Sequence, residues 1–132
     1  MMIVVSTSDL IGAPLDWAVA IAEELHPLPP SSEPHSSCVV MAYPDEPVGG
    51  QGRYMYGPSR RWDFGGPIIE RERIALVNSG GEWDAHVRGG YTHDEGVTGD
   101  AESTGPTPLI AAMRAFVASK LGDEVEVPVV SA

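Results

Sequence analysis

The sequence predicts an α+β fold: a single small domain with a mainly antiparallel sheet, two main helices and one short helix. The helices are predicted because residues 13–25 and 107–121 repeat apolar side chains at helical spacing. The sheet is predicted because the other apolar segments are short, β-branched and bounded by turn residues. The predicted order is strand, helix, strand, short helix, hairpin, helix, strand, which favours helices packed on antiparallel strands. The sequence leaves open whether helices cover one face of the sheet or both.

Length and composition set the class of protein. The chain has 132 residues, of which 42% are hydrophobic, so we expect residues 1–132 to form one globular domain with its own core. Its apolar runs are shorter than a membrane span, and its first residues lack the pattern of a secretory signal. The single cysteine, Cys38, cannot form an internal disulfide, and we interpret it as a small buried residue. Together these features predict a cytoplasmic protein.

The first part of the chain predicts a strand followed by a helix. Residues 2–5 are apolar and β-branched and precede a Ser/Thr cluster, which is typical of a short strand. Pro14 predicts that the continuous helix begins near Ala13, after a separate turn at residues 8–11. Asp16, with Glu23 and Glu24, is predicted to lie off the buried stripe of this helix. The stripe consists of Ile11, Leu15, Ala18, Val19, Ala22 and Leu25.

The segment that follows cannot continue this helix. Residues 26–37 hold four prolines and four serines, which predicts an insert or linker. Its two histidines and Cys38 match no zinc-binding spacing, so we predict no metal site there. Residues 39–43 predict a buried strand, and the Pro and Gly residues of 44–52 predict a loop after it.

A β-hairpin is predicted in the second half of the chain. Residues 74–77 and 83–87 are strand-like, and Asn-Ser-Gly-Gly at 78–81 between them is turn chemistry. The second strand alternates, so one of its faces should pack on the helices and the other should face solvent. Trp83, Ala85 and Val87 form the apolar face, and Asp84, His86 and Arg88 form the polar face.

The C-terminal part predicts a loop, a helix and a last strand. Residues 89–105 are rich in Gly, Thr and acids without an apolar period, which predicts a mobile acidic loop; no EF-hand spacing is present. The second main helix has Thr107 as its N-cap and Gly122 as its stop. Residues 124–127 alternate Glu and Val, which is typical of a charged edge strand.

The stretch 54–72, YMYGPSRRWDFGGPIIERE, is the candidate binding surface, because it gathers aromatic rings, arginines and a double glycine. Gly65-Gly66-Pro67 is typical of a loop closing into a short helix, whose backbone N–H groups hold anions. The alternative interpretation is an ordinary turn. If the stretch is functional surface, replacing Trp62 should cost little stability, whereas Trp83 should behave as core. The predicted ligand-binding residues are Tyr54, Tyr56, Arg60, Arg61, Trp62, Asp63, Gly65, Gly66, Pro67 and Glu70.

Three blocks of the sequence resemble the phage NinX family, small proteins of tailed phages whose function is not established. They are DLIGAPLDWAVA at 9–20, WDFGGPIIERE at 62–72 and GPTPLIAAMRAFVASKLGDEVEVP at 105–128. The chain departs from the family pattern at Arg60-Arg61, where smaller polar residues are usual, at Pro14, and in a long insert before Cys38. The resemblance implies a phage protein acting in a host cell.

Charge excludes some partners and indicates others. The formal net charge is −11, from 19 acidic and 8 basic residues, which argues against binding to nucleic acid or to an anionic membrane. Yet five of the eight basic residues are arginines within residues 53–73, and Arg suits bidentate contacts with phosphate or carboxylate. The alternative is that these arginines pair with the protein's own acids. They are Arg53, Arg60, Arg61, Arg71 and Arg73.

Two functions follow as hypotheses. The first is a small-ligand module that binds a nucleotide or another anion, for which the phage resemblance suggests capture of a host nucleotide signal. The second is an acidic decoy or adaptor that binds a host protein, supported by the net charge and by the loop at 89–105. No catalytic motif is present, so we predict neither an enzyme nor a cofactor. The sequence leaves a homo-oligomer open.

Overall fold

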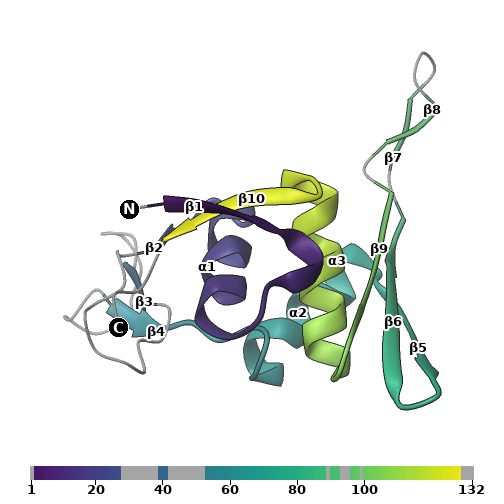
Figure 1. Ribbon diagram of the computed structural model, residues 1–132, viewed down its shortest axis with the longest axis horizontal. Helices are drawn as coiled ribbons and strands as arrows, with labels where there is room; N and C mark the ends of the chain where they lie inside the picture. The colour runs from purple at the N-terminus through teal and green to yellow at the C-terminus, as the bar shows by residue number, and fades with distance from the viewer. Residues whose placement is uncertain are drawn as a thin grey trace.

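The computed structural model describes residues 2–27, 39–41, 53–88, 90–92, 96–98 and 100–128. Within these ranges the chain forms three α-helices and a set of short antiparallel strands, so the predicted α+β class is confirmed. The helices are α1 (Gly12–Ala22), α2 (Trp62–Glu72) and α3 (Pro108–Leu121), with a 3-10 turn η1 at Thr7–Asp9. Figure 1 shows α3 in the middle of the molecule, between α1 and the strands β6 and β9.

The strands of the described part pair in four separate groups, all antiparallel, where the sequence predicted a single sheet. β1 (Met2–Ser6) pairs with β10 (Glu124–Pro128), so the first and last strands of the chain lie side by side. The next groups are β2 (His26–Pro27) with β3 (Val39–Met41) and β4 (Arg53–Met55), and β5 (Ala75–Ser79) with β6 (Glu82–Val87) and β9 (Ala101–Gly105). The last is β7 (Gly90–Thr92) with β8 (Gly96–Thr98).

Helix α3 is the centre of the core, as its apolar pattern predicted. The Thr107 hydroxyl accepts a hydrogen bond from the Ile110 N–H at 3.1 Å, which confirms the predicted N-cap. The helix ends before Gly122, whose φ of +94° suits glycine. Beside it, a Cβ added to Gly105 of β9 would lie 2.8 Å from the Ala111 backbone nitrogen, so only glycine permits this approach. The buried residues of α3 are Leu109, Ala111, Ala112, Met113, Ala115, Phe116 and Val117.

Helix α1 follows the predicted turn and begins within a residue of the predicted start. Its stripe residues Leu15, Ala18 and Val19 are buried, as expected. Asp16 was predicted to lie off the stripe, and this prediction is wrong, because the residue is 0% exposed. Asp16 shares a helical face with Val19 and Ala20, three and four residues later, and both of these are buried too. The covered surface of α1 is therefore wider than one stripe.

Helix α2 begins earlier than the sequence predicted. Gly65-Gly66-Pro67 was interpreted as a loop that closes into a helix, but all three residues lie inside α2, which starts at Trp62. Pro67 is therefore the sixth helical residue and cannot donate the hydrogen bond that position would give to the Asp63 carbonyl. A Cβ on Gly65 would lie 2.5 Å from the Pro58 carbonyl oxygen and 2.6 Å from Leu109 Cδ2. Gly65 is thus a close-packing residue between helix, turn and α3.

The predicted hairpin is confirmed as β5 and β6, with Ala85 and Val87 buried and Trp83 packed against the core. The predicted loop at 89–105 is wrong where the structure describes it, because β7, β8 and β9 lie in it. β9 was missed since its inward residues are small, which leaves no apolar period. The final strand is confirmed as β10. Of the predicted insert at 26–37, His26 and Pro27 form β2, and the rest lies outside the described residues, as do Cys38 and the loop at 44–52.

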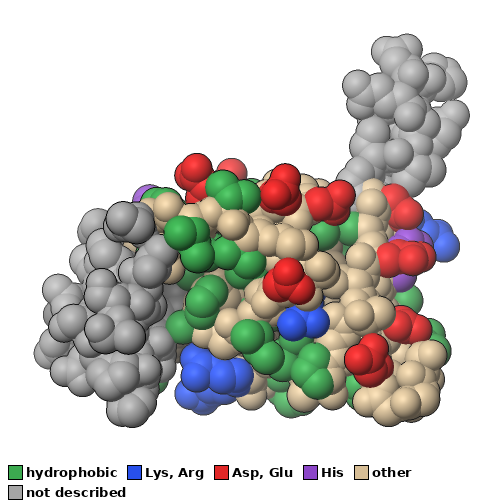
Figure 2. All heavy atoms as spheres, viewed as in Figure 1, with side chains coloured by type: hydrophobic (Ala, Val, Ile, Leu, Met, Phe, Trp, Pro, Cys, Tyr) green, Lys and Arg blue, Asp and Glu red, His purple; other side chains and the backbone are tan. Residues whose placement is uncertain are grey.

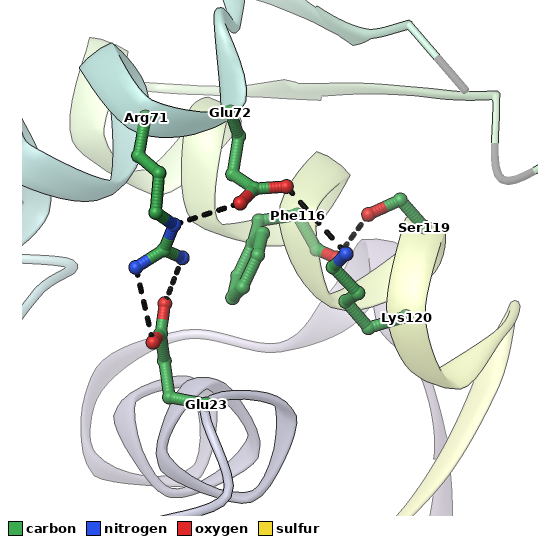
Figure 3. A network of polar contacts seen from close by, with 6 residues as sticks. All are labelled: Glu23, Arg71, Glu72, Phe116, Ser119 and Lys120. Carbon is green, nitrogen blue, oxygen red and sulfur yellow. Dashed lines mark hydrogen bonds and ion pairs between the residues drawn. The ribbon is translucent and has the colours of Figure 1, made fainter. Parts of the chain in front are cut away.

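A polar clasp, defined here as Glu23, Arg71, Glu72 and Lys120, ties the three α-helices together (Figure 3). Arg71 of α2 donates to both carboxylate oxygens of Glu23, at the end of α1, and to Glu72 at 2.8 Å. The Lys120 ammonium of α3 lies 3.6 Å from Glu72. Both cations lie over the Phe116 ring, at 5.8 and 6.0 Å from its centroid. The clasp closes over the edge of the apolar core.

Candidate functional site

The turn between β4 and α2, residues 57–61, is the part of the predicted binding stretch where polar side chains are held in fixed positions. Its backbone is closed by two hydrogen bonds, from the Arg60 and Arg61 N–H groups to the Gly57 carbonyl at 3.0 and 2.8 Å. Residues 57–59 are buried, and the preceding Tyr56 ring packs edge-on against Phe64 with centroids 5.2 Å apart. The turn is therefore fixed from both sides, by its own hydrogen bonds and by aromatic packing.

A buried carboxylate anchors this turn to helix α1. Asp16 Oδ1 accepts from the Ser59 N–H at 2.8 Å, and Asp16 Oδ2 accepts from Arg60 Nη2 at 3.1 Å. Burial raises the pKa of Asp16 above its ordinary value, and the Ser59 and Arg60 contacts oppose this rise. The Ser59 hydroxyl makes no hydrogen bond of ordinary geometry in the described part of the chain, although it lies close enough to the carboxylate to lower that pKa.

Arg60 and Arg61 line a small surface hollow beside the turn. Its volume is about 140 Å³, and its other walls are Met55, Tyr56 and Gly57. The side chains of Arg60 and Arg61 are 50% and 61% exposed. Arg61 donates to both oxygens of the exposed Asp63, at 3.1 and 2.8 Å, and its guanidinium lies 5.5 Å from the Phe64 ring centroid. Figure 2 shows a gathering of basic side chains at one place on the molecule, beside the part left undescribed.

The ten predicted ligand-binding residues do not all meet at this hollow. Tyr56, Arg60 and Arg61 line it. Trp62 is 55% exposed at the start of α2 and is not a lining residue; its ring lies along the helix, near Gly66. Asp63 reaches the hollow only through its pair with Arg61. Gly65, Gly66, Pro67 and Glu70 belong to the body of α2, and the side chain of Tyr54 lies outside the described residues.

The arginines of 53–73 serve more than one purpose. Arg60 and Arg61 each pair with an acid of the protein, as the alternative interpretation of the sequence expected, and both still keep half or more of the side chain exposed. Arg71 belongs to the clasp, where the hydrogen bonds that it donates to Glu23 and Glu72 raise its pKa. Arg73 ends α2 with a φ of +53°. Among the arginines whose side chains the structure describes, the candidate site contains two, and Asp16 is the neighbour that the sequence did not reveal.

Among the residues of the described ranges, no group of three or more His, Cys, Asp or Glu side chains is arranged to hold a metal ion. The helices that the structure describes are all too short or too polar to cross a membrane.

One known protein family matches most of the chain. The family model described as bacteriophage P22 NinX matches residues 6–120. The chain belongs to the NinX family. The match spans α1, α2 and all but the last residue of α3, and with them the turn at 57–61 and its anchor on Asp16. No curated protein sequence matches this NinX protein.

Proposed function

We propose that this NinX protein binds a small anion through the guanidinium groups of Arg60 and Arg61, and that it does so without catalysing a reaction. The observation that carries the proposal is the fixed position of Arg60 at an exposed hollow. The fully buried Asp16 holds one of its nitrogens at 3.1 Å, while half of the side chain stays open to solvent. An arginine fixed before the ligand arrives loses less conformational entropy on binding.

Arg61 supplies a second cation that a ligand can recruit. Its partner Asp63 is 59% exposed, and exposed ion pairs of this kind contribute only about 0–1 kcal/mol. An anionic group that enters the hollow can replace this carboxylate at little cost and gain bidentate contacts. The volume of about 140 Å³ suits one phosphate or carboxylate group, with the remainder of the ligand outside. The hollow thus favours a ligand with one terminal anionic group.

A nucleotide is the ligand class that best combines these features. Its phosphate would lie between the two guanidinium groups, and its base would extend over exposed surface beside Met55. The phage family supports the choice by analogy, because a phage protein in the host cytoplasm gains from capturing a host nucleotide signal. The net charge of −11 means that binding depends on these local cations rather than on the overall field.

Thermal unfolding with inorganic phosphate and a panel of nucleotides tests the proposal. A ligand at ten times its dissociation constant adds about 1.4 kcal/mol of stability, which raises Tm by roughly 5 °C in a domain of this size. We expect Arg61→Gln to abolish this shift. Arg88→Gln is the matched control, since it changes the net charge equally from an exposed position outside the hollow. An unchanged shift in Arg61→Gln, or no shift with any compound, contradicts the proposal.

A further inference from the structure

The open face of the β5–β6–β9 sheet carries a hollow that the proposed anion site does not use. Helix α3 packs on the other face of this sheet, against Ala85 and Gly105 (Figure 1). The hollow measures about 650 Å³, several times the volume beside Arg60. It is lined by Ser8, Ala75, Val77, Asp84, Ala85, His86, Glu102, Ser103 and Thr104.

The strand register gives this face an apolar strip beside an acidic strip. One cross-strand row runs from Val77 through Asp84 to Thr104, and the next runs from Ala75 through His86 to Glu102. The β5 side chains in both rows are apolar, and Val77 is 59% exposed. The carboxylates stand on β6 and β9, one or two strands further across. A face with exposed apolar atoms bordered by charges of one sign is typical of a binding surface.

Four carboxylates border this face, and fewer cationic side chains lie near it. Glu82 and Asp84 are exposed on β6, and Glu102 is exposed on β9. Asp100 accepts a hydrogen bond from His86 Nε2 at 2.8 Å when that nitrogen carries the proton. Arg88 follows at the end of β6. Arg114 reaches the sheet from α3, but its guanidinium is held by the Leu10 and Thr104 carbonyls. Figure 2 shows Asp and Glu side chains along this side of the molecule.

We infer that this face binds an extended basic segment of a partner protein. Lys and Arg side chains have apolar stems that can cover Ala75 and Val77 while their charged ends reach Asp84 and Glu102. In an extended segment every second side chain points to the same side, and the distance between these side chains matches the distance between successive rows on the sheet. A second copy of the chain is disfavoured, because it would bring the same carboxylates to the same face. The inference does not depend on the anion site, which lies on other elements.

A synthetic decapeptide of alternating Arg and Thr is the probe, titrated calorimetrically into the full chain at low salt. We expect the double variant Asp84→Asn, Glu102→Gln to bind it about tenfold more weakly, because two exposed ion pairs are lost. The matched control is Glu124→Gln, Glu126→Gln, which removes two exposed strand glutamates from β10. We expect this control to change the affinity less than about twofold, through the general field alone.

Val77→Ser tests whether apolar contacts contribute to peptide binding in addition to charge attraction. This change keeps every charge and alters only the apolar strip, and Val77 is exposed enough that the fold should tolerate it. We expect it to weaken binding about threefold, by loss of buried apolar area under the arginine stems. Equal losses in the two charge variants, no effect of Val77→Ser, or no binding of the peptide would each overturn the inference. Melting curves of all variants check that the fold is kept.

Discussion

Asp16 shows how a single residue can hold a surface site from beneath. It belongs to α1, yet its two oxygens bind Ser59 and Arg60 on the turn before α2. Burial of a carboxylate costs free energy unless hydrogen bonds compensate, and here a backbone N–H and a guanidinium do so. Because Arg60 is half exposed, the pair is buried on one side only. Asp16 therefore holds Arg60 at the hollow while its own burial is compensated by these two contacts.

Replacing Asp16 should separate its structural contribution from that of an exposed acid. Asp16→Ala leaves the buried Ser59 N–H without its acceptor, so we expect a loss of about 1–3 kcal/mol in the free energy of unfolding. Asp63→Ala, which removes the exposed partner of Arg61, should cost less than about 1 kcal/mol. Urea unfolding followed by circular dichroism measures both. Similar small losses would show that the carboxylate does not anchor the turn.

Asp16 also makes the stability of the fold depend on pH, in a direction set by its raised pKa. The pKa of Asp16 is raised by burial above its ordinary value of 3.8, so the folded chain binds this proton more tightly than the unfolded chain. The resulting stabilisation is complete below pH 3.8 and is lost as the pH rises through the folded pKa. Asp16→Asn cannot ionise. Its free energy of unfolding, relative to that of the unmodified protein, should therefore be higher at pH 7 than at pH 3.

At the scale of elements, α2 is where local sequence rules failed. Pro at the first helical turn is a common pattern, and it placed the helix start at Pro67. In the structure the helix begins five residues earlier, at Trp62. The helix therefore lacks the backbone hydrogen bond that a residue other than proline would donate at position 67. The early start puts Gly65 against Pro58 and Leu109, where a side chain does not fit. Tertiary packing of the turn against α2 thus outweighs the local cost of Gly and Pro in a helix.

The two glycines of α2 make a matched test of this packing. A Cβ at Gly65 would lie within 2.6 Å of two groups, whereas a Cβ at Gly66 would meet only the Trp62 ring, at 3.9 Å. We expect Gly65→Ala to cost about 1–3 kcal/mol through overpacking. Gly66→Ala should stabilise the protein by about 0.5–1 kcal/mol, because it removes a flexible residue from a helix interior. Stabilisation by both changes would mean that α2 does not pack against the turn as described.

Sequence patterns recovered the elements whose signals are local. The caps and stripe of α3 and the alternation of β6 were sufficient, because they depend on nearest neighbours in the chain. β9 was missed for a tertiary reason: it needs small residues such as Gly105 to let α3 approach, and small residues carry no periodic signal. Of the site, Arg60 and Arg61 were predicted and Asp16 was not, since its partners lie more than 40 residues away.

At the scale of the whole molecule, charge is arranged unevenly on an acidic protein. The exposed arginines of the hollow belong to the turn at 57–61, and the carboxylates of the open sheet face lie on β6 and β9. α3 and the helices packed on it separate these two surfaces. The two proposed binding surfaces therefore lie on different elements, and variants of either surface should leave the other intact.

The clasp joins the three helices that separate those surfaces, and its charges tie their packing to pH. Burial tends to raise the pKa of Glu72, but the hydrogen bond from Arg71 and the charge of Lys120 outweigh this and lower it below its ordinary value of 4.5. A lowered pKa means that the folded chain keeps this carboxylate ionised more readily than the unfolded chain. The stabilisation is therefore present above pH 4.5 and is lost as the pH falls through the folded pKa.

Glu72→Gln tests this coupling against a neighbouring residue of the same helix. At pH 7 we expect it to lower the free energy of unfolding by about 0.5–1 kcal/mol, because the pairs with Arg71 and Lys120 lose their charge partner. At pH 3, below the ordinary pKa of 4.5, the unmodified protein has itself lost part of this contribution, so the difference should shrink. Glu70→Gln, an exposed acid outside the clasp, should change stability little at either pH. Urea midpoints at the two pH values measure the effect, and a Glu72→Gln difference that persists unchanged at pH 3 would show that shape, rather than charge, holds the three helices together there.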